Sequence, residues 1–211
     1  MGILSFLFGN KKSDNAAAYA DERRETLDVK ELFQSAVSSF AEGAYDLAEQ
    51  GFAGVLEIDA DHLDSHYYLG RILEERASGE DDFDAVEGAM DRYREVLAGN
   101  PNHLDARIRL GMLNIRGGFY EGALRELDEA VRIDPQSPIA HAKLGKAHYA
   151  IAIAREVKVE HPTGLGATTD FKGSKEGFKR ALDELRRAIK LDNDLEEELS
   201  PMMERIGKRV K

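Results

Sequence analysis

Histidine supplies the side chains in this sequence that are best suited to metal binding or proton transfer, and six occur along the chain. His62 and His66 stand four residues apart, a spacing that places two imidazoles on one face of a helix. We expect Asp64 to cap the helix that follows, however, which leaves His62 outside it. His141 and His148 share one side of a helix, but no glutamate between them completes a metalloprotease pattern. We therefore predict no metal site.

Other signatures of catalysis are missing from the sequence or lack their context. The chain has no cysteine, which excludes disulfides, thiol catalysis and cysteine-based zinc sites. Gly164-Leu-Gly166 resembles part of a phosphate-binding loop, yet no strand pattern precedes it and no Gly-Lys-Ser/Thr follows. No Ser-His-Asp or paired-carboxylate spacing stands out. The sequence therefore predicts a protein that is not an enzyme and needs no cofactor.

Composition narrows the class of partner and the compartment. The 211 residues are 42% hydrophobic and 33% charged, and the net charge is −11. Nucleic-acid binding needs a surplus of Lys and Arg to neutralise phosphates, so the acidic balance argues against it. No window is apolar for long enough to span a bilayer, and the oily N-terminus is too short for a signal peptide. We predict a cytoplasmic protein that binds other proteins.

Two series of residues repeat along the chain, and each fits helix packing. Small residues recur at intervals of 34, 41 and 34, at Ala36, Gly70, Gly111 and Gly145. A second series pairs an alanine with a large apolar residue four positions later: Ala48/Phe52, Ala89/Tyr93, Ala123/Leu127 and Ala181/Leu185. The distance from each alanine to the next unit's small residue is always 22, so the variation in length falls inside units. A small residue lets two helices approach closely, and a large residue one turn along fills the adjoining space.

On these residues the chain resembles the tetratricopeptide repeat family, whose 34-residue unit carries Leu-Gly, Ala-x-x-x-Phe and a late proline. The segment from Asp105 to Pro135 matches best, whereas the family's early tryptophan is missing throughout. The resemblance implies an all-α fold, a right-handed α-solenoid of helix–turn–helix repeats. We expect an N-terminal segment at 1–27, a C-terminal capping helix at 193–211, and between them four repeats at 28–61, 62–102, 103–136 and 137–192.

Local signals predict where helices begin and end. Gly43, Gly117-Gly118 and the Asn100-Pro101 and Asp134-Pro135 pairs should end helices, and Asp64 and Asp105 should cap the helices after them. Ser200-Pro201 should start the capping helix. We expect this helix to cover the last repeat with three apolar side chains, Met202, Met203 and Ile206.

In solenoids of this type the first helix of each unit lines the concave side. Counting residues opposite the core anchors gives a stripe of aromatic and basic side chains with six cations, Lys30 included, against four acids. The predicted groove residues are Phe33, Val37, Phe40, Tyr67, Tyr68, Arg71, Ile108, Arg109, Met112, Arg116, Lys143, Lys146 and Tyr149. This stripe favours a partner peptide or helix that is apolar and partly acidic. The alternative is that several of these side chains pack against neighbouring helices.

Two insertions distinguish this chain from a minimal repeat protein. Unit two carries seven extra residues around 78–82, equal to about one extra turn on each helix. Unit four carries 24, which we expect to extend its first helix over 151–159 and to end it at His161-Pro162, before a loop. The insertions form either a second interaction surface or loops without a role. A chaperone-tail clamp of the family is not expected, because Phe33 and Val37 stand where the clamp needs Lys and Asn.

The N-terminal tip is apolar and is followed at once by two lysines. It contains Ile3, Leu4, Phe6, Leu7, Phe8, Lys11 and Lys12. These residues suit either the interface of a membrane, as a peripheral contact, or a docking site on the solenoid or a partner. The leading interpretation is a protein–protein interaction scaffold or adaptor. The alternatives are a dedicated chaperone for one hydrophobic client segment and an assembly factor tethered to a membrane by its tip.

Overall fold

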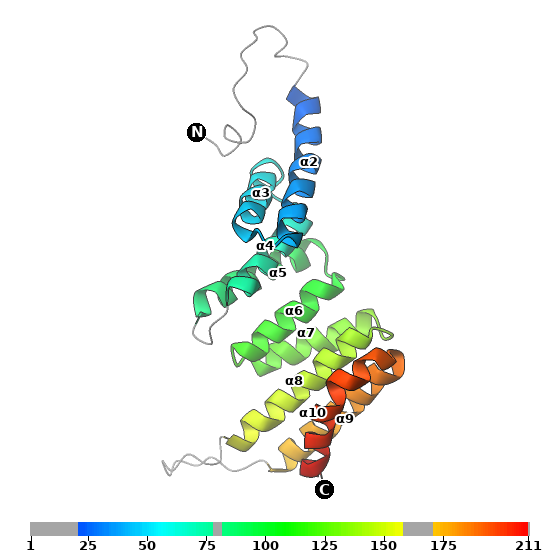
Figure 1. The fold of residues 1–211 in the computed structure, drawn as a ribbon. Coiled ribbons are helices and arrows are strands. Elements are labelled where there is room, and N and C mark those ends of the chain that lie inside the picture. Colours follow the sequence, from blue (N-terminus) through cyan, green and yellow to red (C-terminus); the bar gives the residue numbers. More distant parts are fainter. Residues whose placement is uncertain (1–20, 78–81, 158–170, 211) are drawn as a thin grey trace, which may run out of the picture. The chain divides into compact units, whose positions relative to one another are not determined.

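The computed structural model describes residues 21–77, 82–157 and 171–210, and within these ranges every regular element is helical (Figure 1). The helices are α2 (Asp21–Ala41), α3 (Tyr45–Ile58), α4 (Leu63–Arg76), α5 (Phe83–Gly99), α6 (Leu104–Arg116), α7 (Tyr120–Ile133), α8 (Pro138–Val157), α9 (Phe171–Leu191), a 3-10 turn η1 (Asn193–Leu195) and α10 (Glu196–Val210). Helices α2 to α9 form four antiparallel pairs, each joined by packing within the pair. None of the described helices is long and apolar enough to cross a membrane.

The two repeated series meet inside each helix pair. A Cβ placed on Gly70 would lie 2.8 Å from the ring of Tyr93. The same construction on Gly111 and Gly145 meets the Cγ atoms of Leu127 and Leu185, at 2.7 and 2.8 Å. The glycine of the first helix therefore makes room for the large residue of the second, which is the packing that the spacing predicted.

The chain divides into two compact units, residues 1–101 and 102–211. The core of unit 1 contains Ala36, Ala48, Phe52, Leu69 and Ile72. Unit 2 contains one cluster around Leu127 and Leu144 and a second around Phe178 and Leu185.

Histidines, not aspartates, cap two of the first helices. The Nδ1 atoms of His62 and His103 each accept a hydrogen bond of 3.2 Å, from the backbone N–H of Ser65 and Ala106 respectively. The predicted caps Asp64 and Asp105 were wrong by two positions, because the helices begin at Leu63 and Leu104. Both aspartates lie instead in the first turn, where a negative charge suits the positive end of the helix dipole.

The C-terminal helix starts before the predicted Ser200-Pro201 position. Asp192 accepts a hydrogen bond from the N–H of Asp194 and begins η1, and α10 follows at Glu196 with Pro201 inside it. The expected covering of the last repeat is confirmed: Ile206 and Leu199 are buried in the core around Phe178, and the two methionines pack against its edge.

The insertions lengthen helices as well as connections. In the second repeat, α5 is three residues longer than α7 and α4 is one residue longer than α6. The other extra residues lengthen the connection between α4 and α5. The expectation of an extra turn on both helices was therefore wrong for α4. In the fourth repeat, α8 is seven residues longer than α6, as expected. Helix α9 is also seven residues longer than α7. The two extensions pack together, because a Cβ on Gly177 would lie 3.1 Å from the Cβ of Ala152.

Candidate protein-interaction surface

A continuous aromatic cluster joins the helices of unit 1. Tyr68 stacks on Phe52 with ring centroids 4.9 Å apart and planes 7° from parallel. Phe33 lies 5.6 Å from Phe52, and Phe40 lies 5.2 Å from Tyr68, with the rings tilted or edge-on. Tyr67 continues the cluster, 5.6 Å from Tyr68. Aromatic pairs at these separations attract one another beyond their area of contact.

This packing bears on the predicted groove residues of unit 1. Phe33, Val37, Phe40 and Tyr68 are half-buried and pack against the core of this unit. Part of each side chain therefore packs against neighbouring helices, which is the alternative that the sequence left open. Their remaining exposed area, with that of Tyr67, lies on the two first helices α2 and α4.

Arg71 extends the aromatic cluster with a cation. Its Cζ lies 5.0 Å from the centroid of the Phe40 ring, within the range of a cation–π contact. Its Nη2 is 4.0 Å from a carboxylate oxygen of Glu75, and its buried Nε has no hydrogen-bond partner among the described residues.

Unit 2 carries the remaining predicted groove residues on α6 and α8. Ile108 is an exception to the prediction: it is 5% exposed and belongs to the core with Leu127 and Leu144. Its position on α6 faces both α7 and α8, so counting along one helix did not separate it from the surface. The side chains that keep exposed area are Arg109, Met112, Arg116, Lys143, Lys146 and Tyr149.

Lys146 on the exposed side of α8 forms an ion pair with a carboxylate of another helix. Its Nζ lies 2.5 Å from Oε1 of Glu198, on α10. The hydrogen bond from Lys146, followed by the charges of Lys146 and Lys143, lowers the pKa of Glu198. Tyr149 lies beside this pair on α8 and contacts the ring of Phe178 at 5.9 Å.

The charges of the predicted stripe are divided unequally between the units. In unit 1 two cations, Lys30 and Arg71, stand against three acids, Asp64, Glu74 and Glu75. In unit 2 four cations stand against one acid: Arg109, Arg116, Lys143 and Lys146 against Asp105. The aromatic character thus belongs mainly to unit 1 and the positive charge to unit 2.

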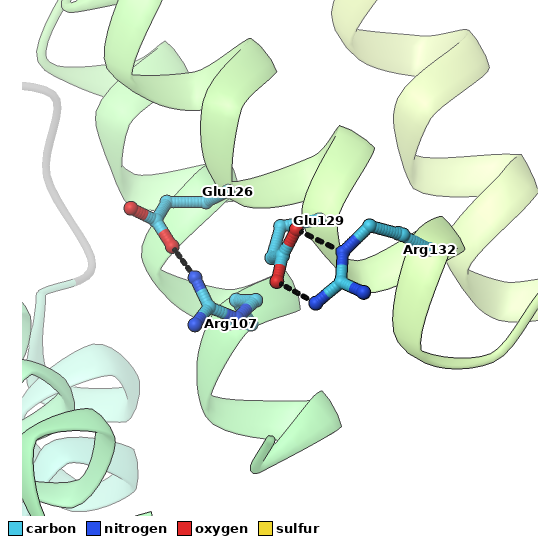
Figure 2. Close-up of polar contacts among 4 residues, drawn as sticks. All are labelled: Arg107, Glu126, Glu129 and Arg132. Atoms are coloured by element: carbon cyan, nitrogen blue, oxygen red, sulfur yellow. Dashed lines mark hydrogen bonds and ion pairs between the residues drawn. The ribbon is translucent and has the colours of Figure 1, made fainter. Parts of the chain in front are cut away.

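Two ion pairs engage four other charged side chains of α6 and α7. Figure 2 shows Arg107 of α6 paired with Glu126 of α7 at 2.7 Å, and Arg132 binding Glu129 through two nitrogens. The Arg132 hydrogen bonds lower the pKa of Glu129. These acids already have cationic partners, so they do not offset the basic side chains of the first helices.

Comparisons with known proteins agree with this architecture. A family model described as a TPR repeat, the tetratricopeptide repeat, matches residues 115–151, from the end of α6 into α8. This segment therefore matches one tetratricopeptide repeat, in a chain whose helices are paired as in that fold. No curated protein sequence matches the chain.

Solved tetratricopeptide structures share the fold over most of the chain. MamA from Desulfovibrio magneticus RS-1 is 21% identical, with a TM-score of 0.54 and 81% of each chain covered. YrrB, described as a TPR protein with an unusual peptide-binding site, is 18% identical, with a TM-score of 0.54, covering 83% of this chain and 91% of its own. An O-GlcNAc transferase from Thermobaculum terrenum is 22% identical, with a TM-score of 0.55 over 78% of this chain, which spans only 27% of the transferase. At these identities the likeness establishes the fold alone.

In the part of the chain that the structure describes, no group of three metal-ligating side chains occurs. His141 is buried between Glu184, 2.6 Å from its Nδ1, and the carbonyl of Pro135, to which Nε2 donates at 3.1 Å. His148 of α8 interacts electrostatically with Asp128 of α7 and Glu184 of α9. The predicted absence of a metal site stays a prediction for the chain as a whole, and the N-terminal tip (Ile3, Leu4, Phe6, Leu7, Phe8, Lys11 and Lys12) lies outside the described residues.

We expect His148 to make folding sensitive to pH. Burial lowers its pKa below the ordinary value of 6.5, despite the opposing charges of Asp128 and Glu184. Because the unfolded chain takes up this proton first, the contribution of His148 to stability is complete above about pH 6.5 and is lost as the pH falls. Urea unfolding between about pH 7.5 and 5.5 should therefore show a shallower loss of stability in His148→Gln than in the wild type. Equal slopes in the two proteins would show that His148 does not contribute to the pH dependence of stability.

The sequence did not reveal the role of Glu198 beside the basic residues of α8. Its only signal was the acidic run Glu196-Glu197-Glu198 next to buried Leu199, which indicated a helix start without indicating its partner. Only the packing of α10 on the last repeat brings this carboxylate to Lys146.

Proposed function

We propose that this protein is a non-enzymatic interaction scaffold that binds an acidic, partly apolar segment of another protein. The segment contacts the basic face of unit 2, defined as Arg109, Arg116, Lys143 and Lys146 on α6 and α8. The observation that supports this most directly is the bond between Lys146 and Glu198, in which the acidic first turn of α10 pairs with this face at 2.5 Å. Complementary charge of this kind favours the approach and the orientation of a partner.

Apolar contacts come from the same two helices. Met112 and Tyr149 are half-exposed on α6 and α8 and can receive apolar side chains of the bound segment. The peptide-binding site named for YrrB, which shares this fold, supports a peptide or helix as the bound element. The proposed role needs neither a cofactor nor a nucleic acid, and we place it in the cytoplasm.

Charge reversal on the basic face tests the proposal. The full-length Arg109→Glu/Lys143→Glu variant should retain partners from lysate of its source cells at least about tenfold less than the wild type, because two attractive contacts become repulsive. Quantitative mass spectrometry of the retained proteins measures the difference.

The matched control is Arg132→Glu/Lys208→Glu, which changes the net charge equally on side chains that are 69% and 72% exposed elsewhere in unit 2. The control should retain partners as the wild type does. Unchanged retention by the Arg109/Lys143 variant would contradict the proposal. Retention of one aggregation-prone protein in place of stable partners would favour the dedicated-chaperone interpretation.

A further inference from the structure

Helix α9 differs in charge from every other second helix of the repeats. Its 21 residues contain seven Lys and Arg against three Asp and Glu, a net charge of +4. Counted in the same way, α3 carries −3, and α5 and α7 carry −2 each. The whole chain carries −11. Such a concentration of positive charge on one helix of an acidic protein indicates an anionic partner.

The cations of α9 form a stripe along its exposed side. Lys175, Lys179, Arg186 and Lys190 follow one another at intervals of four, seven and four residues, which places them on one face of a helix. All four are exposed. At a rise of 1.5 Å per residue this basic stripe is about 22 Å long. A different face of α9, with Phe178, Ala181, Leu185 and Ala188, is buried in the core of unit 2, which leaves the stripe on the solvent side of the helix.

The chain itself does little to neutralise the basic stripe. Arg186 has Asp183 at 3.5 Å, but both side chains are more than 60% exposed, so this pair is weak. No ion pair joins Lys175, Lys179 or Lys190 to any residue within 21–77, 82–157 and 171–210. Cations four residues apart, such as Lys175 and Lys179, repel each other and disfavour the helix. An external anion would relieve that repulsion.

We propose that the basic stripe of α9 binds the surface of a membrane that contains anionic phospholipids. The four exposed large hydrophobic side chains of the described residues, Leu47, Phe83, Phe119 and Ile139, all lie outside α9. A specific protein interface needs apolar or aromatic anchors, and a single-stranded nucleic acid needs aromatic rings for stacking. An anionic lipid surface requires only positive charge from such a stripe, because each Lys or Arg near the surface adds its own favourable contact.

Vesicle co-sedimentation of the full-length protein tests this inference, which is independent of the proposed function. The vesicles contain phosphatidylcholine with about 30% phosphatidylserine, or phosphatidylcholine alone. The wild type should bind the anionic vesicles more tightly than the neutral ones, and the binding should weaken as NaCl rises from about 50 to about 500 mM. Lys175→Gln/Lys179→Gln/Lys190→Gln should weaken the binding about 100-fold.

A control variant separates the stripe from net charge. Arg94→Gln/Arg132→Gln/Lys208→Gln removes three exposed cations that have acidic neighbours, and it should bind nearly as the wild type does. Thermal melts check that each variant is folded. The inference is overturned if the wild type does not prefer anionic vesicles, or if the two variants lose affinity equally. It is also overturned if the lysine variant keeps its vesicle affinity and loses only binding to a short duplex DNA tested in parallel.

Discussion

Replacing Phe178 by alanine should lower the free energy of unfolding by about 3–5 kcal/mol. Phe178 is 1% exposed, and it lies in the cluster that joins α8, α9 and α10. Its ring contacts Tyr149 at 5.9 Å and the guanidinium of Arg209 at 5.6 Å. Removing the ring would leave a cavity at the position where the ordinary repeat meets the extensions of both helices. Urea unfolding followed by circular dichroism measures the loss.

Phe119 provides the matched control in the same unit. Its side chain is 61% exposed, so Phe119→Ala should change the unfolding free energy by no more than about 0.5 kcal/mol. A loss below about 1 kcal/mol for Phe178→Ala would mean that the insertion-bearing pair is not packed as described.

Gly145→Ala should destabilise the protein by about 1–3 kcal/mol, although alanine favours helix over glycine. The added Cβ would lie 2.8 Å from Cγ of Leu185 and 3.2 Å from the backbone oxygen of Ala181. The side chain of Leu185 cannot move away freely because it is fully buried, and the backbone oxygen belongs to the facing helix. Relief therefore requires α8 and α9 to separate.

The same substitution at Gly207 separates packing from helix propensity. Nothing lies within 4 Å of a Cβ at Gly207, in α10. Gly207→Ala should raise the unfolding free energy by about 0.5–1 kcal/mol. Thermal or urea unfolding of both variants compares them directly. Stabilisation by Gly145→Ala as well would contradict the close approach of α8 and α9.

The repeat packing was predictable because it depends on residues a fixed distance apart. The counterparts of Gly111 and Leu127 stand at the same offset in other repeats, or at an offset changed only by the length of an insertion. The structure brings each glycine and its large partner together. The extension of α8 was predictable for a similar reason, since Ile151 to Val157 continue its apolar pattern. The matching extension of α9 was not, because the sequence does not show where a long connection returns to helix.

Helix ends were harder to predict because several neighbouring residues can cap. At both His62 and His103 the imidazole accepts the backbone hydrogen bond that an aspartate two positions later was expected to accept. Pro201 was expected at a helix start, but α10 has already begun at Glu196. Tertiary packing decides which of several neighbouring residues caps a helix, and the local sequence does not show that packing.

The candidate site was predictable in its residue types but less so in its exposure. Arg109, Lys143 and Lys146 keep exposed area on first helices, whereas Ile108 is buried. Helical counting gives the direction of a side chain around one axis, but burial depends on how many helices surround it. Likewise the basic stripe of α9 lies on a second helix, to which the family resemblance assigned no function.

Photocrosslinking shows whether the basic face of unit 2 receives an acidic segment of a partner protein. A photoreactive amino acid replaces Met112 on α6 or, as the control, Arg132 on α7, in the full-length protein in its source cells. Sequencing of the crosslinked peptides then locates the contact. We expect Met112 to capture a partner segment rich in Asp and Glu with apolar residues between them, and Arg132 not to do so. Equal capture from both positions, or capture of neutral or basic segments at Met112, would contradict this expectation.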